Sequence, residues 1–174
     1  MVIKVEKLAE KQIVNLFLPQ KITADNGLVI ALPDRRQDND LCHAIMQIKG
    51  IERCLLAENL LAVKYENEQE YEEIKLQLLA EIDDYISAGG KFITNTAELP
   101  VITTAEILAD SLIRPTLNRD GGDLQFVQFS DGVLSVQFTG HCAGCPYAQN
   151  TLNNVVSKTL CRYIPEIQKI QVEE

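Results

Sequence analysis

The chain has 174 residues, 46 % of them apolar, and a formal net charge of −9. Its length suits one ordinary domain or two small ones, and its apolar content is enough for a packed core. The acidic balance argues against a nucleic-acid-binding groove or a site for anionic lipid, because both need a basic face. No apolar run approaches the ~18 residues that span a bilayer, so we expect neither nucleic acid nor a membrane as a partner.

Two features of the sequence bear on the cellular compartment. The start, MVIKVEKLAEKQ, mixes Lys with Glu and lacks both the apolar core of a signal peptide and the Arg-rich, acid-poor character of a transit peptide. The five cysteines are odd in number and unevenly spread, unlike the even, dense set of a secreted disulfide scaffold. We therefore expect a cytoplasmic protein, in which a close cysteine pair binds a metal or acts in redox chemistry.

The first part of the chain predicts mixed strands and helices. The residues up to about Leu18 have loosely spaced apolar side chains and are compatible with a helix. Asp40 is placed to cap a helix that stops at Gly50. Short apolar runs between turn residues predict three strands, at 27–32, 51–56 and 60–65.

A second helix is expected after a Glu-rich start at 66–73. Its apolar residues recur at spacings of three and four, as on one helix face: Tyr71, Ile74, Leu78, Ile82 and Tyr85. The order strand, helix, strand, strand, helix predicts a small α+β domain over residues 1–92, with its helices on one face of the sheet.

The rest of the chain predicts a linker and a second small domain. Residues 93–102 lack a helical period and contain Pro100, so we expect a linker there. Thr103 and Glu106 have the spacing of a capping box at the start of a helix that Pro115 weakens.

Beyond this helix, the elements are a turn at NRDGGD, a hairpin, a cysteine loop, a helix and a last strand. The hairpin strands are 124–129 and 134–138, and the second helix carries an apolar stripe from Leu152 to Tyr163. The second domain is therefore expected over 103–174. The predicted fold class is α+β, with two small mixed domains, each a short sheet with two helices, joined by the linker.

Cys142 and Cys145 are the candidate site residues. They lie on the predicted turn between a strand and a helix, with Pro146 at the expected first helical position. Backbone N–H groups at a helix start favour negative charge and so stabilise thiolates. Gly140 and Gly144 remove side-chain bulk, which lets the backbone approach a bound metal or sulfide.

Two thiolates are half of an ordinary metal site, because structural zinc and most iron–sulfur clusters take four ligands. Cys161 lies 16 residues beyond Cys145, about 24 Å along a helix, and faces away from the apolar stripe. His141 is read as a solvated neighbour of the pair. Cys42 and Cys54 are read as small buried residues of the first domain. A two-fold dimer would bring two cysteine loops together, and the four thiolates fit a shared [4Fe–4S] cluster.

Other readings of the cysteine pair stay open at this point. Idle thiols beside a helix start would be an oxidation hazard without a packing benefit. A thiol–disulfide oxidoreductase with Cys142 as nucleophile uses the same spacing, but usually early in a βαβ domain, whereas this pair follows a hairpin. A zinc-bridged dimer would also use both thiolates from each chain.

Longer stretches around the pair carry a family resemblance. The segment LIRPTLNRDGGDLQFVQFSDGVLSVQFTGHCAGCPYAQNTLNNVVSKTL resembles the C-terminal domain of NifU, the defining module of Nfu-type iron–sulfur scaffold proteins. Shared features are the RP before the RDGGD turn, the hairpin, the G-x-C-x-G-C-P loop and a helix that leads to YIPEI. The segment AIMQIKGIERCLLAENLLAVKYENEQEYEEIKLQLLAEIDDYI is similar to the Nfu N-terminal domain, although TADNGLVIAL replaces the family's TPNPN-x-x-K-F start.

The resemblance spans about Lys21 to Val172 and has clear implications for function. It implies a carrier rather than an enzyme, which assembles a [4Fe–4S] cluster between two protomers and transfers it to apo-proteins. Cys142 and Cys145 match the family's cluster ligands. The expected partners are a second copy of the chain when the cluster is bound, upstream cluster donors and apo iron–sulfur client proteins.

Overall fold

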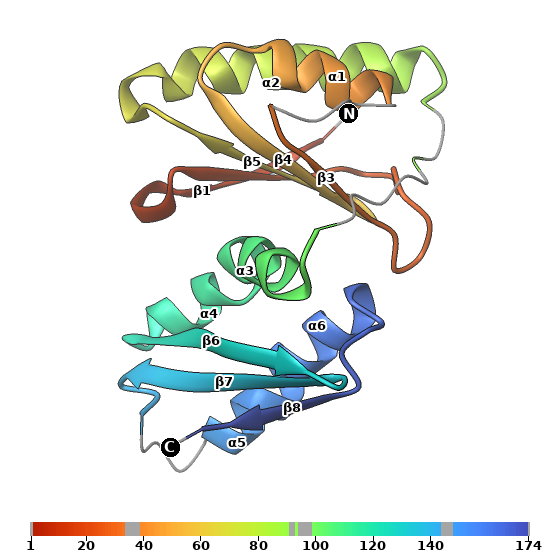
Figure 1. Ribbon diagram of the computed structural model, residues 1–174. Coiled ribbons are helices and arrows are strands. Elements are labelled where there is room, and N and C mark those ends of the chain that lie inside the picture. The colour runs from red at the N-terminus through yellow and green to blue at the C-terminus, as the bar shows by residue number, and fades with distance from the viewer. Residues whose placement is uncertain (1, 34–38, 91–92, 94–98, 144–147, 174) are drawn as a thin grey trace. The chain divides into compact units, whose positions relative to one another are not determined.

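The computed structural model describes residues 2–33, 39–90, 93, 99–143 and 148–173, without the side chains of 148 and 149. The chain divides into two compact units, Met1–Ala97 and Glu98–Glu174 (Figure 1). Each unit contains one sheet and several helices, so the α+β fold class predicted from the sequence is confirmed.

The N-terminal unit is built on a five-stranded antiparallel sheet in the order β1-β2-β5-β4-β3. Its strands are β1 (Lys4–Leu8), β2 (Ile13–Phe17), β3 (Leu28–Ala31), β4 (Ile51–Ala57) and β5 (Leu60–Tyr65). β5, at the centre, pairs along most of its length with both neighbours. An isolated bridge from Thr23 to Ile93 ties the end of this unit back to its beginning.

Two α-helices, α1 (Asp40–Gln47) and α2 (Tyr71–Ser87), lie together on one face of this sheet (Figure 1). Short 3-10 turns precede β2 and α2, at η1 (Ala9–Lys11) and η2 (Glu68–Glu70). The predicted stripe of α2 is largely confirmed: Tyr71, Ile74, Leu78 and Ile82 are buried in the core between helices and sheet. This core is apolar, which is what stabilises a small domain of this kind.

The structure decides one open reading of the sequence and corrects one expectation for this unit. The first stretch forms the β1–β2 hairpin and not a helix, and Gln12 closes the turn in the left-handed conformation, with φ +52°. The cap of α1 is Asn39, whose side chain accepts a hydrogen bond from the backbone N–H of Cys42 over 3.0 Å. Asp40 is instead the first helical residue, where its charge suits the helix dipole.

The C-terminal unit has a three-stranded sheet in the order β6-β7-β8. β6 (Gly122–Ser130) and β7 (Val133–Gly140) form the predicted hairpin, and β8 (Lys169–Val172) pairs parallel to β7. Leu134, Val136 and Phe138 alternate along β7 and are buried, which gives this sheet one apolar face.

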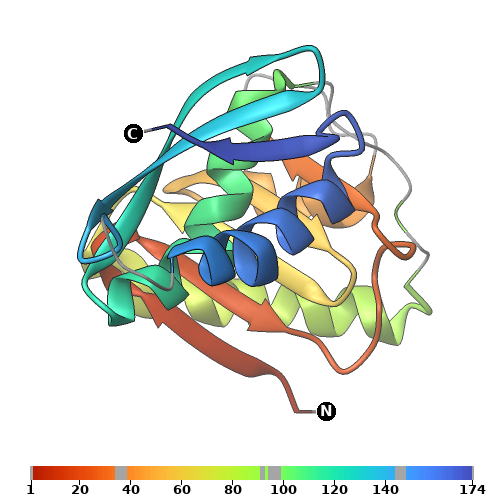
Figure 2. The ribbon, with the colours of Figure 1, turned by 90° about the horizontal axis from the view of Figure 1, so that it is seen from below.

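The helices of this unit are α3 (Val101–Leu112), α4 (Arg114–Arg119), α5 (Ala148–Thr151) and α6 (Lys158–Tyr163). Between α5 and α6, the segment η3 (Leu152–Ser157) has π-helical hydrogen bonds, and the three segments follow one another as a single helical rod (Figure 2). Leu152, Val156 and Leu160 form the buried side of the rod, as the predicted stripe required.

The start of α3 differs from the sequence expectation. The helix begins at Val101, with Pro100 as its cap and no side-chain hydrogen bond at the cap, so Thr103 and Glu106 form no capping box. Thr104 Oγ1 donates to the Pro100 carbonyl over 3.2 Å. Pro115 separates α3 from α4 and stands in the first turn of α4, where a missing N–H costs nothing. Of the expected linker at 93–102, residues 94–98 lie outside the described residues.

In the part of the chain that the structure describes, no helix is long and apolar enough to cross a bilayer.

Candidate functional site

Cys142 lies on the tight turn that follows β7. The turn is closed by a hydrogen bond from the Ala143 N–H to the Gly140 carbonyl over 3.1 Å. Gly140 has φ +62°, a conformation that favours glycine. The Cys142 side chain is half-buried and is not part of a disulfide, whereas His141 and Ala143 are exposed. The thiol is thus held by a compact turn at the surface of the C-terminal unit.

Cys145, the second candidate, lies outside the described residues, as do Gly144 and Pro146. The sequence predicted that backbone N–H groups of this loop can bind an anion, but in the structure some of these groups already have partners. The N–H of His141 donates to the Gly121 carbonyl over 3.0 Å, and that of Ala143 is used in the turn. Two N–H groups of the loop therefore already have backbone partners.

The turn before β6 lies directly against the Cys142 loop. Gly122 pairs with Gly140 across the β6–β7 ladder, and the ring Nδ1 of His141 lies 3.1 Å from the Asp120 carbonyl oxygen. His141 therefore touches the backbone of this turn, in addition to facing solvent. The sequence suggested a turn at RDGGD but not its contact with the cysteine loop, about 20 residues away in sequence.

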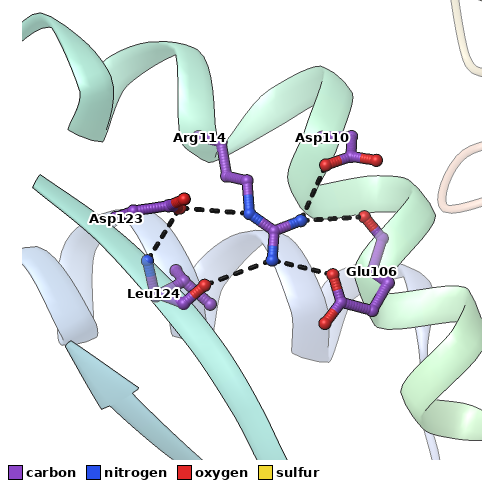
Figure 3. A network of polar contacts seen from close by, with 5 residues as sticks. All are labelled: Glu106, Asp110, Arg114, Asp123 and Leu124. Atoms are coloured by element: carbon purple, nitrogen blue, oxygen red, sulfur yellow. Dashed lines mark hydrogen bonds and ion pairs between the residues drawn. The ribbon is translucent and has the colours of Figure 1, made fainter. Parts of the chain in front are cut away.

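Arg114 is the centre of a polar network that includes Asp123 and Leu124, the residues that follow this turn (Figure 3). Its guanidinium makes ion pairs with Glu106 over 2.7 Å and with Asp110 over 2.7 Å, both from α3. On the other side, its Nε donates to Asp123 Oδ1 and its Nη2 to the Leu124 carbonyl, each over 3.1 Å. The side chain thus connects α3 to the first residues of β6.

The arginine is 6 % exposed, which makes its charge dependent on these partners. Burial alone lowers the pKa of Arg114, but the hydrogen bonds and charges of Glu106 and Asp110 outweigh it and raise the pKa overall. All three guanidinium nitrogens of Arg114 make hydrogen bonds, and their planar arrangement holds the partner groups in place better than a lysine ammonium could. Glu106, which was expected in a capping box, instead pairs with Arg114, and the spacing of these residues in the sequence did not indicate the network.

The other described cysteines belong to other elements of the chain. Cys161 is exposed on α6, as predicted, and partial burial of its thiol raises its pKa. Cys42 and Cys54 are buried in the core of the N-terminal unit, also as predicted. A feature that the sequence did not reveal is that their thiols are hydrogen-bonded to each other.

Among the described residues, no group of three or more His, Cys, Asp or Glu side chains is arranged to hold a metal ion. The described part of the site therefore supplies one thiol on an accessible turn. Such a thiol can bind a soft metal centre only together with other thiolates, the ligand type that iron–sulfur clusters take.

Comparison with protein-family models and curated proteins places this turn in a known type of domain. Residues 106–171 match the NifU-like domain. The chain is 29 % identical over 168 residues to the protein named NFU1 iron–sulfur cluster scaffold homolog, mitochondrial, of Homo sapiens. It is 28 % identical over 142 residues to the protein of the same name from Drosophila persimilis. The resemblance predicted from the sequence is thereby confirmed.

The extent of these matches differs between the two relatives. The human match covers 89 % of this chain and 65 % of the relative, and the Drosophila match covers 75 % and 50 %. The chain thus spans about half to two thirds of the length of these curated relatives. A crystal structure of a Staphylococcus aureus protein superposes on 47 % of this chain and 99 % of its own, with a TM-score of 0.41 and 12 % identity. Both relatives are named as mitochondrial, so the expected cytoplasmic location stays a prediction.

Proposed function

Since the chain carries a NifU-like domain and is similar to NFU1 iron–sulfur cluster scaffold proteins along most of its length, we propose that it is an iron–sulfur cluster scaffold and carrier. Its cargo is a [4Fe–4S] cluster held between two protomers by Cys142 and Cys145 of each. The cluster then passes to apo-proteins that need one. In this role the protein is a carrier and not an enzyme.

The ligand count supports a site shared between two chains. A cluster of this type takes four thiolates, and a single chain offers two in the matched loop. Cys161 lies on α6 with a raised pKa, and Cys42 and Cys54 are buried in the other unit, so none of these is suited to complete the set. A second copy of the chain supplies the missing pair by symmetry.

The observation that carries the proposal is the position of Cys142 on a surface turn inside the matched region. The turn holds the thiol half-buried, which gives it a fixed place and leaves one side open. Thiolates of a recipient protein can approach an exposed cluster and replace the ligands one by one. A buried cluster with four ligands from one chain would resist such exchange.

Anaerobic reconstitution with iron and sulfide tests the proposal. The wild-type protein should gain visible absorption and about two irons per chain, the amount that a shared [4Fe–4S] site requires. It should then activate an apo-enzyme that depends on such a cluster. Cys142→Ser should lose the colour, while Cys161→Ser, a matched change of an exposed cysteine, should keep it. Absence of a cluster in the wild-type protein would contradict the proposal.

Two further assays distinguish the alternatives that use the same cysteines. An oxidoreductase would reduce insulin disulfides with turnover, and a scaffold would not. A zinc-bridged dimer would be colourless and would contain zinc after purification in the presence of a chelator. Zinc bound without a chelator is a weak result, since thiolates also take zinc opportunistically.

A further inference from the structure

We propose that Gly122 is a positioning residue for the cluster ligand Cys142, and that Arg114 holds the strand start that carries Gly122. The inference rests on the proposed function, because it concerns how the cluster thiol is placed. It is built on contacts within the C-terminal unit alone.

Cys142 occupies the space beside the Cα atom of Gly122. A Cβ atom added to Gly122 would lie 2.0 Å from Cys142 Sγ, 2.9 Å from its Cβ and 3.2 Å from its backbone nitrogen. Non-bonded heavy atoms prefer separations of about 3.5–4.0 Å, so the sulfur occupies the space that any larger residue would fill. Gly122 itself is buried at the first position of β6. The thiol therefore fills the space that a side chain on Gly122 would occupy, and we call this space the seat of Cys142.

Gly122 has no positive φ, so its conformation does not require glycine. Glycine is required here because there is no space for a Cβ atom. The three atoms nearest to such a Cβ all belong to Cys142. This distinguishes Gly122 from Gly121 and Gly140, whose φ angles are +72° and +62°. An alanine at Gly122 tests the contact with the thiol without straining the backbone.

Two neighbouring contacts keep the seat and the thiol together. The His141 N–H donates to the Gly121 carbonyl over 3.0 Å. A Cβ on Gly140 would lie 2.5 Å from the same carbonyl oxygen, so the two backbone segments approach as closely as glycine allows. The turn that holds Cys142 is thus locked to the turn that holds Gly122.

Arg114 fixes the other side of the seat. Asp123, the next residue after Gly122, accepts hydrogen bonds from Arg114 Nε over 3.1 Å and from the Leu124 N–H over 2.8 Å. Arg114 Nη2 also donates to the Leu124 carbonyl (Figure 3). Through these contacts the buried guanidinium ties the first residues of β6 to α3. A shift of Arg114 therefore moves Gly122, and with it the place where Cys142 rests.

Placement matters because metal ligands act at fixed distances. Loss of groups that orient a ligand commonly weakens metal binding by about 10–100-fold, although those groups never touch the metal. A sulfur displaced by about 1 Å leaves a site that is present but too loose to hold its metal. We expect an effect of this size from Gly122→Ala.

A double-mutant cycle on the apo-protein tests the contact without any cluster. Gly122→Ala should lower the thermal unfolding midpoint of the full chain by about 5 °C or more, as expected for overpacking of a buried site. In a Cys142→Ala background the 2.0 Å contact with the sulfur is gone and only the milder approach to the retained Cβ remains, so the same change should cost less. If Gly122→Ala lowers the unfolding midpoint equally in both backgrounds, the proposed contact between Gly122 and the Cys142 sulfur is wrong. Gln125→Ala, an exposed change on the same strand, should show no coupling with Cys142→Ala.

The second readout is the position of the thiol itself. In Gly122→Ala the sulfur is pushed out of its seat, so Cys142 should react several-fold faster with iodoacetamide, followed by peptide mass spectrometry. Unchanged reactivity would contradict the proposal. Arg114→Lys, which keeps the charge but has no planar fork, should raise the reactivity of Cys142 in the same direction. A purely structural role of Arg114 would lower stability and leave this rate as in the wild-type protein.

Reconstitution then connects the seat to the function. Gly122→Ala should retain about 10–100-fold less cluster than the wild-type protein on gel filtration, while Gln125→Ala should retain as much. If the wild-type protein binds no cluster, the proposed function fails, whereas the cycle and the alkylation rates still decide the position of the thiol. If Gly122→Ala retains the cluster as firmly as the wild type, the positioning role is wrong and the scaffold function stands.

Discussion

The hydroxyl of Tyr65, at the end of β5, donates a hydrogen bond to Glu68 Oε2 over 2.7 Å. Tyr65 is fully buried, and its ring lies 5.6 Å from that of Tyr71 at the start of α2. The contact therefore joins the central strand of the N-terminal unit to the segment that leads into its long helix. Burial, the hydrogen bond and the charge of Glu68 all raise the pKa of Tyr65 far above its usual value.

This shift predicts a loss of stability in alkali. A group whose pKa is raised in the folded state contributes fully below its unfolded pKa, which is about 10 for tyrosine, and the contribution is lost as the pH rises beyond that value. The free energy of unfolding should therefore fall more steeply above pH ~10 in the wild-type protein than in Tyr65→Phe. At neutral pH, Tyr65→Phe should cost about 1 kcal/mol for the lost hydrogen bond. Urea unfolding at a series of pH values measures both effects, and parallel curves would contradict the first.

The thiols of Cys42 on α1 and Cys54 on β4 should react much more slowly than the exposed thiol of Cys161. The hydrogen bond between the two thiols lowers the pKa of Cys42, while the same bond and complete burial hold the pKa of Cys54 well above its usual value. Both residues are at most 1 % exposed. We expect iodoacetamide to label Cys161 in native buffer and to label Cys42 and Cys54 only after unfolding. Mass spectrometry of the labelled peptides reports this, and labelling of all three at one rate would show that the N-terminal core is open.

The ligand assignment predicts which cysteines the cluster needs. Cys142→Ser and Cys145→Ser should each abolish cluster binding, because a dimer would then offer two thiolates in place of four. Cys42→Ser, Cys54→Ser and Cys161→Ser should leave the iron and sulfide content unchanged. Loss of the cluster in Cys161→Ser, with an unchanged circular dichroism spectrum, would show that the assignment is wrong.

The division of the chain into two compact units predicts separable domains. A fragment of residues 98–174 contains α3, the β6–β7 hairpin, the cysteine loop and the rod from α5 to α6. We expect it to fold alone and to take up the cluster, while residues 1–97 bind no iron. Amide-proton dispersion in NMR spectra and the iron content of each fragment test this. A C-terminal fragment without dispersion would place the boundary elsewhere.

Most elements could be predicted from periodicity, but the β1–β2 hairpin could not. β2 reads IVNLF and its residues are buried on both faces of the sheet, so the alternation that marks a half-exposed strand is missing. The hairpin turn uses Gln12 in the left-handed conformation, where a glycine would have given a signal. An apolar run without a turn residue cannot be distinguished from a buried helix by sequence alone.

The contact between Gly122 and Cys142 was hidden for a different reason. The sequence predicts hairpin strands at 124–129 and 134–138, and counting outward from the turn between them pairs Gly122 with His141. In the structure the register shifts between Phe126 and Gln128, so the extra residue in β6 brings Gly122 opposite Gly140. Such bulges follow from packing against the rest of the unit and leave no fixed signature in sequence. The Cys42–Cys54 contact is likewise tertiary, because it joins a helix to a strand.

The last prediction concerns the link between cluster binding and dimer formation. Each chain supplies half of the proposed ligand set, so the cluster binds only to the assembled pair and stabilises that pair by mass action. Without a cluster, two thiol loops face each other on chains that each carry a net charge of −9, and this repulsion disfavours the dimer. We therefore expect a mainly monomeric apo-protein and a dimeric cluster-bound protein with about two irons per chain. Light scattering before and after reconstitution measures the change, with Cys142→Ser as the control that should stay monomeric under both conditions. A cluster-loaded monomer would disprove the shared site, whereas a tight apo-dimer would leave the site possible and disprove the linkage.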